Sequence, residues 1–310
     1  MNKFKELLFL KNINGLGKVK INKNYLHLLN EFSDLDDLIS EMEFKFKFEY
    51  DKLENAKIKA EETYEKVINN PKIQVITIFD VNYPKKLLEM GSKKPLILYV
   101  MGNVEALSKP NIAVIGTRKP SGLSKSFEEN LVKNIVNSSE RAIISGLALG
   151  CDKIAHQTTV DESKITIAVL PGDVNKIKPA SNKNLAEDIL KTGGCLISEY
   201  EPGIRVQKGN YVERDKIMAA LSDAIFVVEC GVESGTMHTV NFAKEYKRQI
   251  YSYLPDERPE GSYDGNEFIL NENFGAVKVE DIEEFIENLK TLNVKKQRKT
   301  SQPSLYDFSE

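Results

Sequence analysis

One arginine of this chain stands where an apolar segment ends, a position at which it could bind a phosphate. In the stretch NIAVIGTRKPSG, residues 111–122, an apolar run ends at Gly116 and is followed by Thr117, Arg118 and Lys119. A guanidinium at the mouth of a crevice can bind a phosphate through two parallel N–H bonds. A lone arginine more often forms a surface ion pair, but a position after a glycine and ahead of a helical pattern favours the phosphate.

Later loops show the same mixture of glycine and small polar residues. The loop SGLALGCD contributes Ser145, Gly146 and Gly150, and the loop CGVESGTMHT contributes Ser234, Gly235 and Thr236. Glycine lets a backbone approach a ligand closely, and the amides at helix N-termini favour negative charge. We therefore expect these loops and Arg118 to form one anion-accepting crevice.

The elements that would position these loops alternate along the chain after Pro71. Near-continuous apolar runs such as NIAVIG, RAIISG, ITIAVLPG, GCLISEY, DAIFVVEC and QIYSYLP are typical of strands covered on both faces. Helical patterns lie between them, and strict alternation forces crossovers and a parallel sheet with helices on both sides. The sequence predicts an α/β fold with a doubly wound, mostly parallel sheet, in which ligands bind beyond the carboxyl ends of the strands.

The first 70 residues differ from this pattern and predict a small helical region. DLDDLISEM and DKLENAKIKAEETYEKVINN have helical periodicity, whereas the state of EFKFKFEY between them is ambiguous. Gly15 and Gly17 lie between two helical patterns, as in modules that offer backbone amides to a phosphate. An ordinary interhelical turn is the more frequent reason for two such glycines.

Composition excludes a globally basic protein. The 310 residues include 43 Lys and Arg against 46 Asp and Glu, a net charge of -3, so any site for a polyanion must be local. The 3 cysteines match neither a disulfide framework nor a zinc site, and a reducing cytoplasm is the best fit. No run approaches the ~20 apolar residues of a spanning helix, so we expect no membrane association.

An ordered series of motifs resembles the DNA-processing protein A (DprA, also called Smf) family. The series begins with VNYPKKLLEMGSKKPLILYVMGN and continues through IAVIGTRKPSG, IISGLALGCDKIAH, TIAVLPGDVNKIKPASNKNLAEDI, LISEYEPG and VESGTMHTVNFAKEYKR to DGNEFI, over roughly residues 81–269. The resemblance implies an extended Rossmann-like fold, binding of single-stranded DNA, homodimerisation and delivery of incoming strands to a RecA-type recombinase in natural transformation. It implies no enzymatic activity and no cofactor, and it assigns Arg118 to the DNA backbone.

One motif departs from the family pattern. Where the family usually reads Phe-Pro-x-Arg-Asn-Arg-Ile, this chain reads YVERDKI, residues 211–217. Arg214 is kept and Lys216 keeps its charge, but Asp215 replaces an asparagine and Glu213 adds a second acid. A carboxylate within ~4 Å of a phosphate costs on the order of 1 kcal/mol in water, unless Asp215 instead pairs with Arg214 or Lys216. The resemblance adds Asn210, Arg214, Lys216 and Lys178 to the candidate phosphate-binding residues; Lys178 is equally well read as a solvated turn residue.

A second function stays open from the residues alone. ECGVESGT is distantly reminiscent of the loop with which related Rossmann-like proteins cleave N-glycosidic bonds, so a small-nucleotide sensor or nucleotide N-glycosidase is the alternative. Glu199 and Glu229 end two strands at the same edge, where tethering loops through backbone N–H groups is the more frequent use of a carboxylate. His156 and His238 have no nucleophile beside them, so we expect no catalytic residue.

The last residues predict a disordered tail, which divides the chain into a helical region (1–70), a Rossmann-like domain (71–293) and a tail (294–310). Lys295, Lys296, Arg298 and Lys299 form a basic cluster in the tail, more often a solvated linker than a nucleic-acid contact. QPSLYDF resembles the short peptide with which bacterial repair and replication proteins dock on the sliding clamp. Its docking residues would be Gln302, Leu305, Tyr306 and Phe308.

Overall fold

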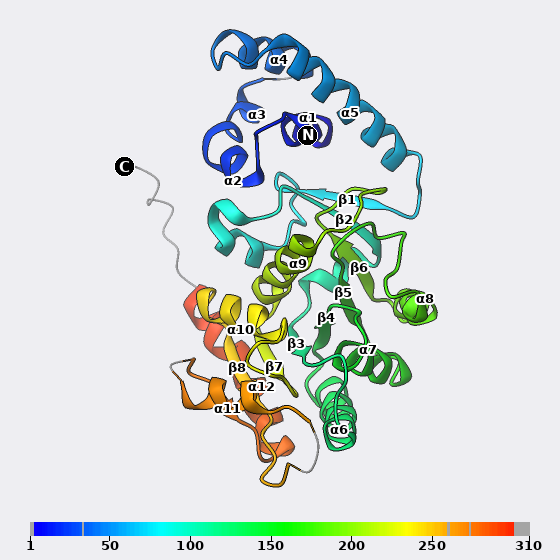
Figure 1. Ribbon diagram of the computed structural model, residues 1–310, viewed down its shortest axis with the longest axis vertical. Coiled ribbons are helices and arrows are strands. Elements are labelled where there is room, and N and C mark those ends of the chain that lie inside the picture. Colours follow the sequence, from blue (N-terminus) through cyan, green and yellow to red (C-terminus); the bar gives the residue numbers. More distant parts are fainter. Residues whose placement is uncertain (1–2, 33, 259–260, 273, 301–310) are drawn as a thin grey trace.

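The fold is built on one nine-stranded sheet with helices on both faces (Figure 1). The structure, a computed structural model, describes residues 3–32, 34–258, 261–272 and 274–300, with side chains as far as residue 291. The strand order is β1-β2-β6-β5-β4-β3-β7-β8-β9. Pairing is parallel from β6 to β9 and antiparallel between β1 and β2 and between β2 and β6. The predicted doubly wound, mostly parallel α/β fold is confirmed.

The parallel strands are the apolar runs of the sequence. They are β3 (Asn111–Ile115), β4 (Ala142–Ser145), β5 (Thr166–Val169), β6 (Cys195–Ser198), β7 (Ala224–Val227), β8 (Gln249–Ser252) and β9 (Val277–Lys278). Successive side chains of a strand point to opposite faces, so both faces of β3 are covered. Ile112 and Val114 belong to one apolar cluster, and Ala113 and Ile115 belong to another.

The helices that follow β3 divide between those two clusters, except α8, which belongs to a third. They are α6 (Gly122–Ser138), α7 (Cys151–Asp161), α8 (Lys183–Lys191), α9 (Lys208–Leu221), α10 (Thr236–Glu245), α11 (Asp264–Asn271) and α12 (Ile282–Thr300). Helices α6, α7 and α12 pack on the face of Ile112, whereas α9, α10 and α11 pack on the face of Ala113. Helix α6 packs along α7, and α9 packs along α10. The loop after β3 leads into α6 of the first pair, and the loop after β7 leads into α10 of the second pair.

The N-terminal helices rest on the antiparallel end of the sheet (Figure 1). They are α1 (Phe4–Asn12), α2 (Lys18–Lys20), η1 (Ile21–Tyr25), α3 (Leu28–Glu31), α4 (Leu35–Phe44) and α5 (Tyr50–Ile68). Strands β1 (Gln74–Thr77) and β2 (Ile97–Gly102) follow, with the 3-10 helices η2 (Lys85–Lys93) between them and η3 (Val104–Ser108) after β2. Phe4 of α1 packs edge-on against Tyr99 of β2, with ring centroids 6.2 Å apart. The predicted helical region is confirmed, and it shares an apolar cluster with the sheet.

The C-terminal end of the described chain differs in part from the expected division into segments. Helix α12 continues to Thr300 and so enters the segment from residue 294 that we expected to lack regular structure. The clamp-like residues Gln302, Leu305, Tyr306 and Phe308 lie outside the described residues, as do the side chains of Lys295, Lys296, Arg298 and Lys299. The boundaries at residues 70 and 293 stay predictions. In the described part of the chain, no helix has the length and apolar character needed to cross a membrane.

Candidate nucleic-acid interface

The candidate site lies at the carboxyl end of β3, where the strand order switches: β4, β5 and β6 lie on one side of β3, and β7, β8 and β9 lie on the other. Strand β3 pairs with β4 on one side and with β7 on the other, so the helices that follow β3 and β7 lie on opposite faces. Such a switch point leaves a crevice at the carboxyl ends of the strands, which is where ligands bind in open α/β sheets. The loops 116–121 and 228–235 end at this point.

Three hollows meet at the loop after β3. The first, which we call the crevice, has a volume of about 540 Å³ and lies between that loop, α9 and the start of α10. The second, the side pocket, has about 170 Å³ and reaches toward residues 178–179. The third, the α6–α7 groove, has about 930 Å³ and runs between the two helices for which we name it. Arg118 lines all three hollows.

Arg118 is an exposed cation on a firmly held loop. Within the described part of the chain its guanidinium has no ion-pair partner, so it can bind an anion from solution. The backbone before it is fixed on both sides: Thr117 N donates to Glu229 O (2.7 Å), and Cys151 N donates to Thr117 O (3.1 Å). Gly150, with φ 74°, packs against this backbone, and a Cβ on it would lie 2.3 Å from Thr117 O.

The side chain of Glu229 also holds the loop after β3 through a hydrogen bond. Its side chain is 1% exposed, and its two carboxylate oxygens accept from Ser121 N (2.9 Å) and Ser262 N (3.1 Å). The tethering role considered for this residue is therefore what the structure shows. Glu199 is held differently, because its carboxylate accepts from the Lys18 ammonium at 2.7 Å. Neither glutamate is available as the carboxylate that a nucleotide N-glycosidase needs.

Arg214, the arginine of the motif that departs from the family pattern, is buried between two acids. Arg214 is 6% exposed; its Nε lies 3.0 Å from Asp215 Oδ1, and its Nη1 lies 3.6 Å from Asp152 Oδ2. Neither nitrogen makes a hydrogen bond of good geometry, so these contacts are electrostatic. Burial raises the pKa of Asp215 to about 6, although Arg214 acts in the opposite direction. Asp215 is thus occupied by Arg214, one of the two partners that the sequence suggests.

Glycine at position 146 is explained by Arg214. A Cβ on Gly146 would lie 1.1 Å from Arg214 Nη1, so the guanidinium covers this glycine.

The second added acid, Glu213, is also neutralised: its carboxylate lies 2.8 Å from the Lys18 ammonium and pairs with Lys216 as well. Asp215 and Glu213, the two acids that depart from the family pattern, therefore both have cationic partners within the protein.

The structure brings most of the predicted phosphate-binding residues to the three hollows. The crevice is lined by Gly116, Thr117, Arg118, Arg214, Ser234, Gly235 and Thr236. The side pocket is lined by Arg118, Gly146, Lys178 and Arg214, and the α6–α7 groove by Arg118, Lys119 and Gly150. The spatial grouping of separate loops at one edge of the sheet agrees with the expectation from the sequence.

Three predicted residues line none of these hollows. Ser145 is fully buried, and its hydroxyl donates to Val114 O (2.8 Å). Asn210 is 9% exposed, and its amide donates to Pro171 O (3.1 Å). Lys216 pairs with Glu213, and its ammonium lies 5.4 Å from the centroid of the Phe242 ring. Their hydrogen-bonding groups serve the protein itself.

Among the crevice residues absent from the sequence-based phosphate-binding set are one aromatic residue and one cation, Tyr211 and Lys208. Tyr211, at the start of α9, is half-buried and lines both the crevice and the side pocket. Lys208, one turn earlier, is exposed and lines the crevice. An aromatic ring beside cations is the usual platform on which a base stacks. The signal in the sequence is the spacing of Lys208, Tyr211 and Arg214, which places them on one face of a helix.

His156, Cys195 and Cys230 are packed residues of the protein interior. Burial lowers the pKa of His156 to about 4, and its Nδ1 lies 2.7 Å from Thr166 Oγ1, so this histidine is a neutral, packed residue. Burial raises the pKa of the Cys195 and Cys230 thiols to about 12, which keeps them unreactive. Among the described residues, no group of three or more histidine, cysteine or acidic side chains could hold a metal ion.

Comparison with known proteins agrees with this geometry. Residues 74–290 match the family described as DNA recombination-mediator protein A. The chain is 31% identical over 231 residues to protein Smf of Borreliella burgdorferi, a match that covers 73% of this chain and 70% of that protein. It is 31% identical over 201 residues to DNA processing protein DprA of Streptococcus pneumoniae, covering 65% of this chain and 70% of that protein. Matches to protein Smf of Synechocystis and Escherichia coli span 52% and 54% of those longer proteins.

Solved structures give the same result. The crystal structure of DNA processing protein A from Streptococcus pneumoniae aligns with a TM-score of 0.76 and 26% identity, covering 91% of this chain and 96% of that one. DNA processing protein A from Helicobacter pylori, whose structure describes a single-stranded DNA binding mode, aligns with a TM-score of 0.62 and 28% identity, covering 70% of this chain and 96% of that one. The chain therefore belongs to the DNA recombination-mediator protein A family, also known as DprA or Smf.

Proposed function

We propose that this protein binds single-stranded DNA at the crevice and delivers it to a RecA-type recombinase, as a recombination mediator without enzymatic activity. One observation carries the proposal: Arg118 is an exposed, unpaired guanidinium, held on a fixed loop at the point where three hollows meet. A phosphate in the crevice would meet Arg118 and Lys208 as cations, with hydroxyls of the 234–236 loop and of Thr117 nearby. The Tyr211 ring offers a stacking surface for a base.

The chemistry favours a strand over a single nucleotide. Arg118 is shared between hollows that extend in different directions, whereas a site for one nucleotide would be one enclosed pocket. The crevice residues named above are phosphate- and ring-binding groups without a pattern of base-reading amides, so binding should show little sequence preference. Delivery to a recombinase, in natural transformation or in other recombination, and homodimerisation are parts of the proposal that the family membership supports.

Arg118 provides the direct test. In a fluorescence-anisotropy titration of labelled oligo-dT at two salt concentrations, we expect Arg118→Ala to weaken binding by a factor of roughly 5 to 100, since a charged hydrogen bond contributes on the order of 1–3 kcal/mol. The salt dependence of log K should fall by about 0.7, the value for one phosphate contact on a single strand. Oligo-dT and mixed-sequence oligonucleotides should be affected alike.

Lys66→Ala is the matched control, because Lys66 is an exposed lysine on α5 away from all three hollows. It should leave the affinity within a factor of about two. Equal binding by wild type and Arg118→Ala would contradict the proposed site. Light scattering of the purified protein tests the homodimer, and a strand-exchange assay with a RecA-type recombinase and single-strand-binding protein tests the mediator activity.

A further inference from the structure

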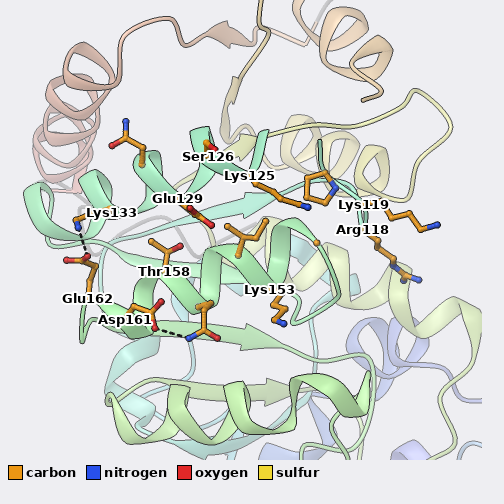
Figure 2. A pocket seen from close by; sticks show the side chains of 15 residues that line it. Arg118, Lys119, Lys125, Ser126, Glu129, Lys133, Lys153, Thr158, Asp161 and Glu162 are labelled. Atoms are coloured by element: carbon orange, nitrogen blue, oxygen red, sulfur yellow. Dashed lines mark hydrogen bonds and ion pairs between the residues drawn. The ribbon is translucent and has the colours of Figure 1, made fainter. Parts of the chain in front are cut away.

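The largest of the three hollows is the α6–α7 groove, which the proposed site leaves unexplained. It begins at Arg118 and Lys119 and continues between the exposed faces of α6 and α7 (Figure 2). From Lys153 to Asp161 the helix axis rises by about 12 Å. The groove is therefore long enough to hold more than one phosphate group of an extended strand.

Unpaired cations gather at the end of the groove that joins the crevice. Figure 2 shows Lys125 of α6 and Lys153 of α7 on the side of Arg118 and Lys119. All four side chains are exposed, and within the described residues none of them forms an ion pair. Four cations without acidic partners form a local positive field in a chain whose net charge is -3.

The opposite end of the groove is acidic. Glu162 is ion-paired with Lys133 at 3.1 Å and accepts from Asn137 at 2.8 Å, and these two contacts lower its pKa. Asp161 accepts from Gln157 at 2.9 Å, and Glu129 begins the acidic part of the groove on the side of Lys125 (Figure 2). Three carboxylates against one lysine make this end unfavourable for a phosphate.

We propose that single-stranded DNA bound at the crevice continues past Arg118 into the α6–α7 groove, where Lys119, Lys125 and Lys153 bind about two further phosphates. The acidic end at Glu129, Asp161 and Glu162 terminates the track. This inference rests on the proposed function, which it extends by giving the strand a direction and a limit.

Continuity of the two hollows favours DNA over an acidic peptide as the occupant. Arg118 belongs to both the crevice and the groove, so a strand that engages this guanidinium has its next phosphates beside Lys119 and Lys153. Polar groups that can hydrogen-bond to sugar and phosphate also line the groove, namely Ser126, Asn130 and Thr158. Among the described residues that line the groove, only Pro120 and Ile154 have apolar side chains, and a peptide is usually anchored by apolar side chains in a well-packed pocket.

Length-dependent binding tests the inference. Oligo-dT from about 4 to about 20 nucleotides spans the range of single-strand site sizes. We expect wild-type affinity to rise with length until the groove is filled. Lys125→Gln combined with Lys153→Gln should bind the shortest oligonucleotides like wild type but stop gaining affinity at a shorter length. For the longest oligonucleotides, the salt dependence of log K should be smaller by about 1.4, or 0.7 for each lost phosphate contact.

Lys66→Gln combined with Lys109→Gln is the matched control, since it removes the same charge from two exposed lysines that line none of the three hollows. It should leave the length dependence unchanged, whereas Glu129→Gln should shift the plateau to longer oligonucleotides. The inference is overturned if the Lys125 and Lys153 variant matches wild type at every length or loses the same factor at every length. Tight binding of polyglutamate to the groove without length-dependent DNA binding would overturn it in favour of a protein partner. Failure of wild type to bind any oligonucleotide contradicts the proposed function itself.

Discussion

The two acids that separate this chain from its family pattern are used inside the protein. Asp215 is buried beside Arg214, and Glu213 pairs with Lys18 and Lys216. Because these carboxylates already have cationic partners in the protein, they should repel a phosphate less than the sequence alone suggests. Arg214 is reduced as a phosphate ligand for the same reason, because Asp152 and Asp215 already surround it. Arg118 and Lys119 are left as the cations of the loop after β3 that form no ion pair among the described residues.

The raised pKa of Asp215 gives a pH test at this residue. An aspartate that ionises at about 6 when folded and near 4 when unfolded binds its proton more tightly in the folded state. Its contribution to the free energy of unfolding therefore falls as pH rises from 4 to 6, by about 3 kcal/mol at about 1.4 kcal/mol per pKa unit. Urea unfolding across this range should show wild type losing stability relative to Asp215→Asn as pH rises.

Asp264→Asn supplies the comparison of opposite sign. Hydrogen bonds from the Ser262 hydroxyl and from Val232 N lower the pKa of Asp264. Its contribution is present above the ordinary aspartate range and is lost as pH falls. Parallel pH curves for wild type and Asp215→Asn would show that burial does not hold the proton on Asp215.

Sequence alone predicts which loops form the site better than which side chains face the ligand. Gly116, Arg118 and Ser234 come together because they follow parallel strands, and the alternation of strands and helices that makes the sheet parallel is readable in the sequence. Ser145 and Gly146 follow such a strand too, yet Ser145 bonds to Val114 and Gly146 is covered by Arg214. A small residue at a strand end looks the same in sequence whether a ligand or a distant side chain fills the space beside it.

At the scale of elements, the position of Arg118 depends on contacts between loops that are far apart in sequence. Glu229, after β7, accepts hydrogen bonds from the loops after β3 and β8. The first turn of α7 contributes Cys151 N, which donates to Thr117 O. The loop is thus tied to both neighbours of β3 in the sheet, and the guanidinium is presented on a rigid support. A rigid support reduces the conformational entropy that binding must remove.

Gly150 tests that support. Gly150→Ala places a Cβ 2.5 Å from the Arg118 carbonyl carbon and 2.6 Å from its Cα, at a φ of 74°. The obstructing atoms are backbone and have little freedom to move, so we expect a loss of about 2–4 kcal/mol in the free energy of unfolding. DNA affinity measured on the folded protein should fall as well, because the Arg118 backbone must shift.

Gly122→Ala is the control for this substitution. Gly122 lies at the start of α6 with nothing within 4 Å of the added Cβ. Alanine favours a helix, so stability should stay the same or rise by up to about 1 kcal/mol. Unchanged stability and DNA affinity in Gly150→Ala would show that packing of α7 does not hold the loop in place.

The parallel part of the fold is predictable because its signals are local. Each parallel strand from β3 to β8 is a short apolar run, and each following helix has a 3.6-residue pattern. The antiparallel strands β1 and β2 are harder to predict, since η2 separates them and the pairing of β2 with β6 joins distant segments. The extension of α12 to Thr300 was missed because its last turns are charged and resemble a solvated tail.

At the scale of the whole molecule, the N-terminal helices are joined to the crevice through charge as well as through the shared apolar cluster. The Lys18 ammonium lies 2.7 Å from Glu199 at the end of β6 and 2.8 Å from Glu213 of α9. Glu213 stands between Val212 and Arg214, both of which line the crevice. A residue outside the matched family region, 74–290, therefore neutralises an acid beside the proposed DNA site.

Lys18→Met tests this coupling. Without the ammonium, Glu199 and Glu213 keep their charges with one partner fewer, and we expect stability to fall by about 1–3 kcal/mol. Oligo-dT should bind more weakly by a factor of a few at low salt, and the deficit should shrink as salt rises, because the Debye length is about 10 Å at 0.1 M. Lys20→Met removes the same charge from the same helix, where the Lys20 ammonium bonds only to Gly15 O among the described contacts (3.2 Å). If both variants weaken binding equally, the effect comes from net charge, and the pairing of Lys18 with Glu213 has no separate role.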